Sequence, residues 1–198
     1  PHFIFNSLNS IHSFLLYDEN EHAEKYLIRF AKLIRQTLSN SRVTYITIEE
    51  EVETLQNYIL LERMRFKDHF DFEIACDLRV LPSYPCIPPM LIQPYVENAI
   101  IHGLAKRKDG AKLLVKFYLE NEQLKVLIED NGVGYSESTK NKRDSGHKSY
   151  GTQITEERLK SLQSKGKSSF AVSVSNLDDS DPEFPGTRVI LVIPMPDY

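Results

Sequence analysis

The sequence has few cysteines, no long apolar run and no strong excess of charge. Only Cys76 and Cys86 occur in 198 residues; neither their number nor their spacing suits a zinc site, and reduced cytosolic thiols are the simplest interpretation, with a disulfide as the alternative. No apolar run approaches the ~20 residues of a membrane-spanning helix, and no signal peptide is visible. The net charge of −4, with no long run of basic residues, gives no reason to expect a nucleic-acid partner.

A polar cluster interrupts an apolar helical pattern in the middle of the chain. We expect a helix over residues 89–104, on which Asn98 and His102 project from one face and Glu97 lies about 100° round from Asn98. Burying these side chains costs several kcal/mol unless each finds a partner, so the cluster either faces water or lines a cleft. In a cleft, the Asn98 side-chain carbonyl would suit Mg²⁺, which prefers oxygen ligands.

A second motif follows the strand that we expect over residues 123–130. The strand ends at Asp130, and Gly132 and Gly134 come directly after it. The glycines let the backbone approach a flat ring, and a carboxylate accepts a hydrogen bond from an exocyclic amine. This combination suits adenine, although an acidic residue before glycines is also ordinary turn chemistry. Further on, Gly151 opens a helical pattern whose backbone amides could face phosphate oxygens.

The order of these motifs resembles that of a known ATP-binding domain. The segments are Glu97-Asn98 with His102-Gly103, Asp130-x-Gly132-x-Gly134, Gly151 before a helix, and Gly186-Thr187 on the last strand. They are similar to the Bergerat-fold domain of gyrase, Hsp90, histidine kinases and MutL.

The first residues narrow the resemblance to one group of kinases. They read Pro1-His2-Phe3-Ile4-Phe5-Asn6-Ser7-Leu8-Asn9, which resembles the phosphoacceptor box of the LytS-type sensor histidine kinases, Pro-His-Phe-Leu-Phe-Asn-x-Leu-Asn. Stretches between the motifs agree as well, including Tyr58, Glu62-Arg63 and Arg65-Phe66. The helix-opening glycine motif departs from the family, because Ser149 stands in place of a glycine and Ile154 in place of an asparagine.

The resemblance implies an ATP site with assigned residues. Asp130 would accept a hydrogen bond from the adenine amine, and Thr187 would help to hold the base. Gly132 and Gly134 would admit the base close to the backbone. Asn98 would ligate Mg²⁺.

The resemblance also implies phosphoryl transfer from Mg·ATP to a histidine. His2 would be the nucleophile, since a neutral imidazole nitrogen near pH 7 needs little activation. Glu97 would polarise the attacking nitrogen or a water molecule. Asn6, one turn after His2, would orient the ring, and His102 would be a hydrogen-bonding partner behind the catalytic groups.

The leading hypothesis is therefore the core of a sensor histidine kinase in a two-component system, which passes its phosphoryl group to an aspartate of a response regulator. One alternative is another ATPase of the same fold, in which Glu97 activates water; the box around His2 argues against it. The other is a degenerate, non-catalytic ATP-binding or dimerisation module, which Ser149 and Ile154 keep open. Because the chain starts inside a motif and without methionine, we expect a fragment, the cytoplasmic domain of an inner-membrane sensor whose sensing part lies upstream.

Periodicity divides the chain into two regions of an α+β fold. Residues 1–66 read as a helical hairpin for dimerisation and phosphoacceptance, followed by a connecting helix over 49–65 that Thr47 caps with Glu50. A hairpin this short buries too little apolar surface alone, so we expect it to form a four-helix bundle with a second copy; the alternative is that it packs only on its own chain.

Residues 67–198 read as an α/β-sandwich ATP-binding domain, a mixed sheet with helices on one face. The polar residues 135–149 are typical of a mobile loop, and the resemblance implies that this loop is the lid over ATP. The expected strands are 70–76, 111–119, 123–130, 169–176 and 186–193, and the expected helices are 89–104 and 151–164.

Overall fold

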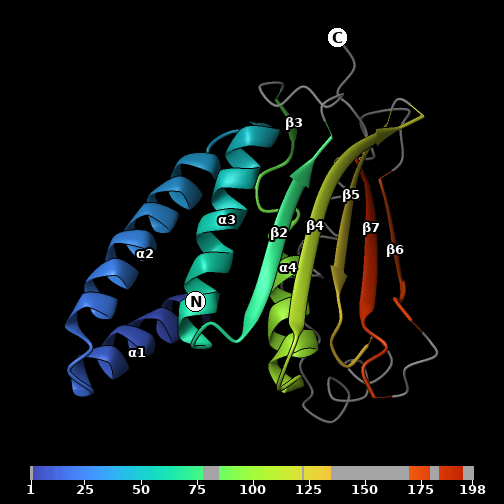
Figure 1. Cartoon of the computed structure of the whole chain (residues 1–198). Coiled ribbons are helices and arrows are strands. Elements are labelled where there is room, and N and C mark those ends of the chain that lie inside the picture. Colours follow the sequence, from blue (N-terminus) through green and yellow to red (C-terminus); the bar gives the residue numbers. More distant parts are fainter. Residues whose placement is uncertain (1, 78–84, 122, 135–169, 179–182, 194–198) are drawn as a thin grey trace.

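The computed structural model describes residues 2–77, 85–121, 123–134, 170–178 and 183–193 (Figure 1). Several expectations lie outside these residues: the loop 135–149, the helix 151–164 with Gly151, and the altered positions Ser149 and Ile154.

The N-terminal region consists of three helices. Helices α1 (His2–Leu16) and α2 (Asn20–Asn40) form the expected hairpin, and α3 (Ile48–Arg65) follows it. The predicted cap of α3 is confirmed: the Thr47 hydroxyl accepts from the Glu50 N–H at 3.0 Å, and the Glu50 carboxylate accepts from the Thr47 N–H at 2.8 Å. This reciprocal pair satisfies two backbone donors that a helix start otherwise leaves free.

Each helix of the hairpin carries two apolar stripes. The inner stripe packs within the chain: Tyr26 and Leu33 are buried in one core with Leu55 and Tyr58 of α3. The outer stripe remains open, since large apolar side chains on both helices are about half exposed or more: Ile4, Leu8, Leu15, Leu27 and Leu38. The hairpin therefore packs on its own chain and still presents an apolar surface; its pairing with a second copy stays a prediction, as does the domain boundary after residue 66.

The C-terminal region is a five-stranded mixed sheet in the order β2-β4-β5-β7-β6, with only β2 and β4 parallel. All five strands were expected, with bounds that differ by at most two residues: β2 Phe70–Cys76, β4 Ala111–Glu120, β5 Gln123–Asp130, β6 Ala171–Asn176 and β7 Thr187–Ile193. The buried side chains of the sheet share a core with α3 and α4 (Gln93–Asn98), which lies behind the sheet in Figure 1. The α+β class with helices on one face is thus confirmed.

The expected helix over 89–104 begins later and changes type. Met90 adopts a left-handed backbone with φ 61°, so the chain turns there, and α4 starts only at Gln93, with Pro94 in its first turn where proline is favoured. The helix then widens into a π-helical turn, Ala99–Gly103, and a 3-10 turn, Leu104–Lys106. The α-helical spacing that we assumed between Asn98 and His102 was therefore wrong.

The sequence did not predict the short strands β1 (Ile46–Thr47) and β3 (Pro85–Ile87), which pair with each other in antiparallel fashion.

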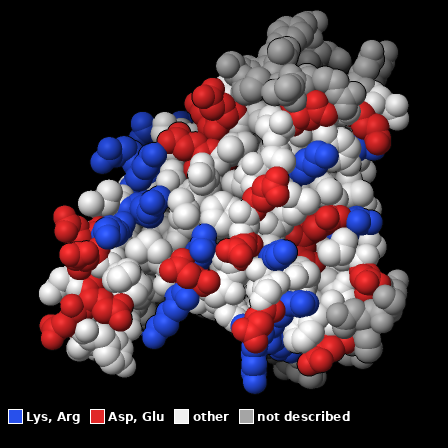
Figure 2. Space-filling model, viewed as in Figure 1, with Lys and Arg blue, Asp and Glu red and all other residues white. Residues whose placement is uncertain are grey.

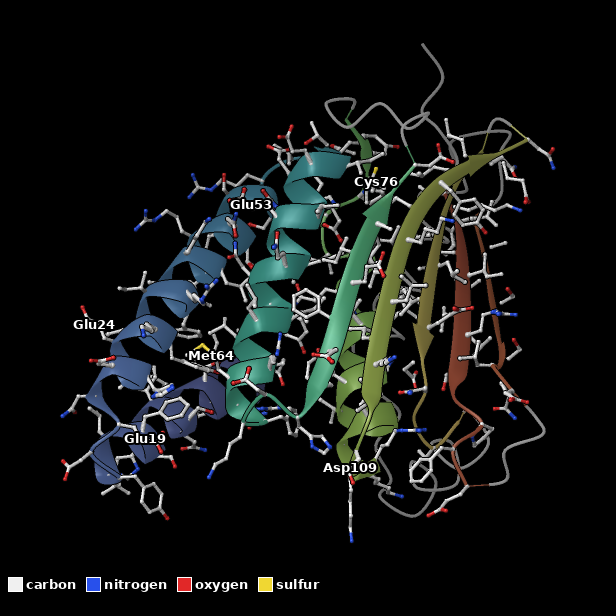
Figure 3. The ribbon with its side chains drawn as sticks, viewed as in Figure 1. Glu19, Glu24, Glu53, Met64, Cys76 and Asp109 are labelled. Carbon is white, nitrogen blue, oxygen red and sulfur yellow. The ribbon has the colours of Figure 1, made fainter. Side chains whose placement is uncertain are left out.

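Cys76, at the end of β2, carries a free and exposed thiol (Figure 3). Acidic and basic side chains are interspersed over the face shown in Figure 2. Within the described ranges, no helix has the length and apolar character needed to cross a membrane.

Candidate nucleotide-binding site

Asp130 is a buried carboxylate at the end of β5. Its side chain is 3% exposed, and its Oδ1 accepts a hydrogen bond from the Gly132 N–H at 2.9 Å. Thr187, the residue paired with Asp130 on the neighbouring strand β7, donates to the carboxylate through both its hydroxyl and its N–H. Burial raises the pKa of Asp130 to about 6, and the hydrogen bonds from Gly132 and Thr187 oppose that rise. Asp130 is thus mostly ionised at pH 7, and a carboxylate accepts about four hydrogen bonds, so it can still accept from a ligand.

The two sequence motifs meet at a contact between glycines. A Cβ atom on Gly132 would lie 2.1 Å from the carbonyl oxygen of Gly103, and one on Gly103 would lie 2.5 Å from Asp130 Oδ1. The Val133 N–H donates to the same Gly103 oxygen at 3.2 Å. The end of the α4 segment and the loop after β5 therefore touch backbone to backbone, which only glycines permit.

Further hydrogen bonds hold the loop after Asp130. Asn131 Oδ1 accepts from the Lys112 N–H at 2.7 Å, and its Nδ2 donates to the Gly110 oxygen at 2.9 Å. The Arg107 guanidinium donates to the Asn131 carbonyl at 2.7 Å. Asn131 was not among the residues predicted from the sequence, although an amide next to a glycine turn is a residue type that often hydrogen-bonds to nearby backbone.

Gly134 and Gly186 complete the turn. Both have a positive φ, of 79° and 64°, and the Gly186 N–H donates to the Gly132 oxygen at 2.9 Å. The structure thus brings together Asp130, Gly132, Gly134 and Thr187, as expected.

The polar residues of the α4 segment precede Gly103, which contacts this loop. Glu97 and Asn98 are half-buried on the last turn of α4, and His102 is exposed on the π-helical turn. Their roles toward metal and nucleotide stay predictions.

Buried acids on α3 face the start and the end of α4. The Glu51 carboxylate accepts from the Ile92 N–H, and burial raises the pKa of Glu51 to about 8. Glu62 is 1% exposed and pairs with Arg65. Burial raises the pKa of Glu62 to about 7; the charge of Arg65 lowers it and that of Glu97 raises it.

These acids were not predicted from the sequence to have a role. A signal was present, since Glu51, Leu55, Tyr58 and Glu62 recur at three- and four-residue spacing and so share one helix face. Two acids within an apolar stripe mark a buried polar contact.

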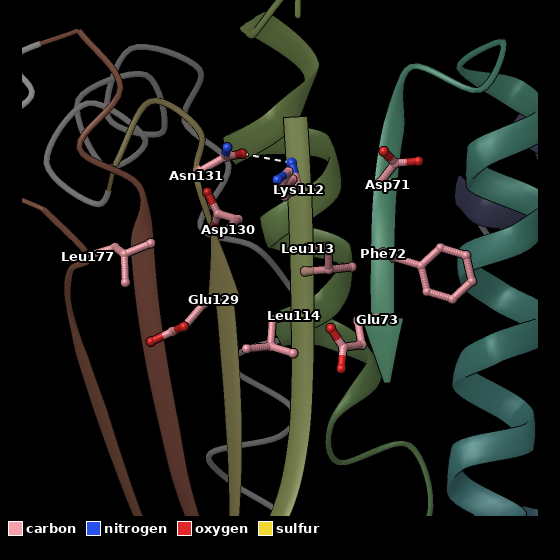
Figure 4. A pocket seen from close by; sticks show the side chains of 10 residues that line it. All are labelled: Asp71, Phe72, Glu73, Lys112, Leu113, Leu114, Glu129, Asp130, Asn131 and Leu177. Carbon is pink, nitrogen blue, oxygen red and sulfur yellow. Dashed lines mark hydrogen bonds between the residues drawn. The ribbon is translucent and has the colours of Figure 1, made fainter. Parts of the chain in front are cut away.

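A pocket of about 490 Å³ lies on the open face of the sheet (Figure 4), and Asp130 and Asn131 of the candidate site are among the residues that line it. Its lining includes the carboxylates of Asp71, Glu73 and Glu129, with Lys112 as the only basic residue among those that line it. Such a negative lining disfavours a polyphosphate, so we do not place the phosphates of a nucleotide in this pocket.

The expected phosphoacceptor lies at the first residue of α1. The ring of Phe3, which follows His2, has its centroid 5.5 Å from that of Tyr58 on α3. Asn6 is half-buried one turn later, and its carbonyl accepts from the Ser10 hydroxyl at 3.0 Å.

The chain is similar to a histidine kinase family and to proteins named LytS. The profile of the histidine kinase family matches residues 1–70. Sensor protein LytS of Staphylococcus saprophyticus is 31% identical over 196 residues, which cover 98% of this chain. Sensor histidine kinase/phosphatase LytS of Staphylococcus aureus is 34% identical over 137 residues, which cover 69% of this chain.

The chain belongs to the LytS-type sensor histidine kinases. It spans 32% of the length of the first of these relatives and 23% of the second.

Solved structures of low sequence identity share the fold. The histidine kinase domain of the Erythrobacter litoralis blue-light activated histidine kinase EL346 aligns with a TM-score of 0.55 and 14% identity, covering 91% of this chain and 83% of that one. The Acinetobacter baumannii histidine kinase AdeS aligns with a TM-score of 0.52 and 13% identity, covering 100% and 99%.

The burial of Asp130 predicts a stability cost in the absence of nucleotide. Its pKa rises from an ordinary 3.8 to about 6 on folding. The charged form therefore destabilises the fold above pH 6, by up to about 3 kcal/mol. We expect Asp130→Asn to unfold at higher urea concentration than wild type at pH 8, with the difference shrinking as the pH falls through 6 and disappearing below about 4. Asp109→Asn, at an exposed position, is the control; an Asp130→Asn variant less stable at pH 8 would contradict the assignment.

Proposed function

We propose that this chain is the ATP-dependent catalytic core of a sensor histidine kinase in a two-component system. The observation that carries the proposal is the buried, ionised Asp130, fixed by Gly132 and Thr187 where the α4 segment touches the glycine loop. A flat base with an exocyclic amine suits such a site, because the glycines leave space beside the backbone and the carboxylate accepts the amine hydrogen. Family membership supports adenine as that base.

The residues beside this loop fit a magnesium-bound triphosphate. The described residues contain no group of three acidic, histidine or cysteine side chains able to hold a metal ion alone. Mg²⁺ is commonly held by one or two protein oxygens together with phosphates and water, so the Asn98 carbonyl is a sufficient protein ligand. The ion would neutralise charge on the β- and γ-phosphates.

The chemistry that we propose is transfer of the γ-phosphoryl group to His2. An imidazole nitrogen of His2 forms a bond to the γ-phosphorus, the bond from phosphorus to the bridging oxygen breaks, and ADP leaves. Glu97 orients the imidazole and accepts the proton of its other nitrogen, and Asn6 helps to orient the ring. In the second step an aspartate of a response regulator takes the phosphoryl group from His2.

The phosphorylated product gives the direct test. With ATP and Mg²⁺, the chain should acquire phosphate on His2 that is labile in acid and stable in base, as a phosphoramidate is. Because α1 begins at His2 and terminal turns fray, several helical turns should be added before Pro1. His2→Gln should abolish labelling and keep ATP binding, and His12→Gln, at an exposed position of the same helix, should leave both unchanged.

Two results would oppose the proposal in different ways. ATP binding without labelling would favour the non-catalytic module that Ser149 and Ile154 keep open. Labelling that survives His2→Gln would place the acceptor elsewhere.

We also propose that residues 1–66 mediate a homodimer. The outer apolar stripes of α1 and α2 support this, because their exposed side chains recur at the spacing of a bundle seam. These side chains are Ile4, Leu8 and Leu15 on α1 and Leu27 and Leu38 on α2.

The relatives named sensor proteins support a place on the cytoplasmic side of an inner-membrane sensor, where ATP and response regulators are found.

The dimer has its own test. Leu27→Glu combined with Leu38→Glu places charges in the seam without touching the inner core, since these side chains are 51% and 62% exposed. We expect this variant to sediment as a monomer with unchanged helix content. Lys25→Glu, on the opposite side of α2, should remain dimeric. A wild-type chain that sediments as a monomer at high micromolar concentration would refute the dimer.

A further inference from the structure

The acceptor end of α1 is packed on a helix of its own chain. The Phe3 ring lies 5.5 Å from the Tyr58 ring and 5.9 Å from the Phe30 ring, measured between centroids. One turn later, Ser7 is buried, and its hydroxyl oxygen accepts from the Tyr26 hydroxyl at 3.4 Å. From Phe3 onward, the first turns of α1 are therefore packed against both α2 and α3.

Tyr58 also faces the helix that carries Glu97. Its side chain is fully buried, on the face of α3 that holds Glu62 and Arg65. Burial raises the pKa of Tyr58 well above its ordinary value, the charges of Glu62 and then Glu97 raise it further, and Arg65 opposes them. Tyr58 and Val96, the residue before Glu97 on α4, belong to one buried core. Among the described residues, no group hydrogen-bonds to its hydroxyl.

Resting on the proposed function, we infer that Tyr58 is a positioning residue, which holds the acceptor end of α1 beside the same chain's Glu97, so that phosphate passes from ATP to His2 within one chain. Holding both reactants on one packed unit removes much of the entropic cost of bringing them together. Transfer to a partner's site would instead require Phe3 to leave the aromatic contact with Tyr58 and Ser7 to leave its buried position.

The first test separates the ring of Tyr58 from its hydroxyl. Tyr58→Leu should slow labelling of His2 by about ten- to a hundredfold while the KM for ATP stays unchanged, because the acceptor moves and the ATP cleft does not. Tyr58→Phe should keep the wild-type rate, since it retains the ring and loses a hydroxyl without a partner. Phe3→Ala removes the contact from the other side and should also slow labelling.

A core deletion elsewhere on α3 is the matched control. Leu61 is as buried as Tyr58 and has no ring contact with Phe3, so Leu61→Ala should label at the wild-type rate wherever ATP binding shows that the chain is folded. Equal slowing by Leu61→Ala would mean that general destabilisation explains the effect. A wild-type rate in Tyr58→Leu, or a Tyr58→Phe as slow as Tyr58→Leu, would also overturn the role of the ring.

The second test asks which chain donates the phosphate. Chains carrying His2→Gln keep the ATP site, and chains carrying Asn98→Ala keep the acceptor; the two are coexpressed with different tags, both with helical turns added before Pro1. Transfer within one chain predicts no phosphate on the Asn98→Ala chain in mixed pairs and a wild-type rate per chain that does not change on dilution. Phosphate on the Asn98→Ala chain overturns the inference alone. A wild-type chain that never labels refutes the proposed function.

Discussion

The contact between Gly103 and Gly132 is the constraint on which the candidate site depends. Neither glycine can carry a side chain, because a Cβ would lie 2.1 Å from a backbone oxygen in one case and 2.5 Å from Asp130 in the other. The contact places the residues that end the α4 segment against the loop that follows β5. It therefore turns two distant sequence motifs into one surface and buries the carboxylate between them, which raises the pKa of Asp130 to about 6.

Helix α3 joins this surface to the helical hairpin. One of its faces contacts the hairpin through Tyr58, and its acids reach the start of α4 through Glu51 and the end of α4 through Glu62. Buried acids are costly unless they are partnered, which is why Glu62 occurs with Arg65. A movement of the hairpin would disturb these contacts directly. The connecting helix thus joins the hairpin physically to the α4 segment that carries Glu97.

Much of this structure could be predicted from local patterns. The alternation of apolar and polar residues predicted the strands of the sheet, and Thr47 with Glu50 predicted the start of α3. Both patterns depend on interactions between residues that are close together in the sequence. The start of α4 was missed because Pro89 was read as part of a helix that the left-handed Met90 prevents. The glycine contact and the packing of Phe3 on Tyr58 join residues far apart in sequence, and the spacing of residues along the chain contains no information about such contacts.

Nucleotide affinity measured by calorimetry tests the central claim most directly. Wild type and Asp130→Asn would be titrated with ATP and Mg²⁺ at pH 8, where Asp130 is ionised. If Asp130 accepts the adenine amine, the variant should lose about 1.5–3 kcal/mol of binding free energy, the range for a hydrogen bond to a charged group. GTP, which carries a carbonyl oxygen in place of that amine, should bind wild type more weakly than ATP does. Equal ATP affinity of the two proteins would contradict the assignment of this cleft to adenine.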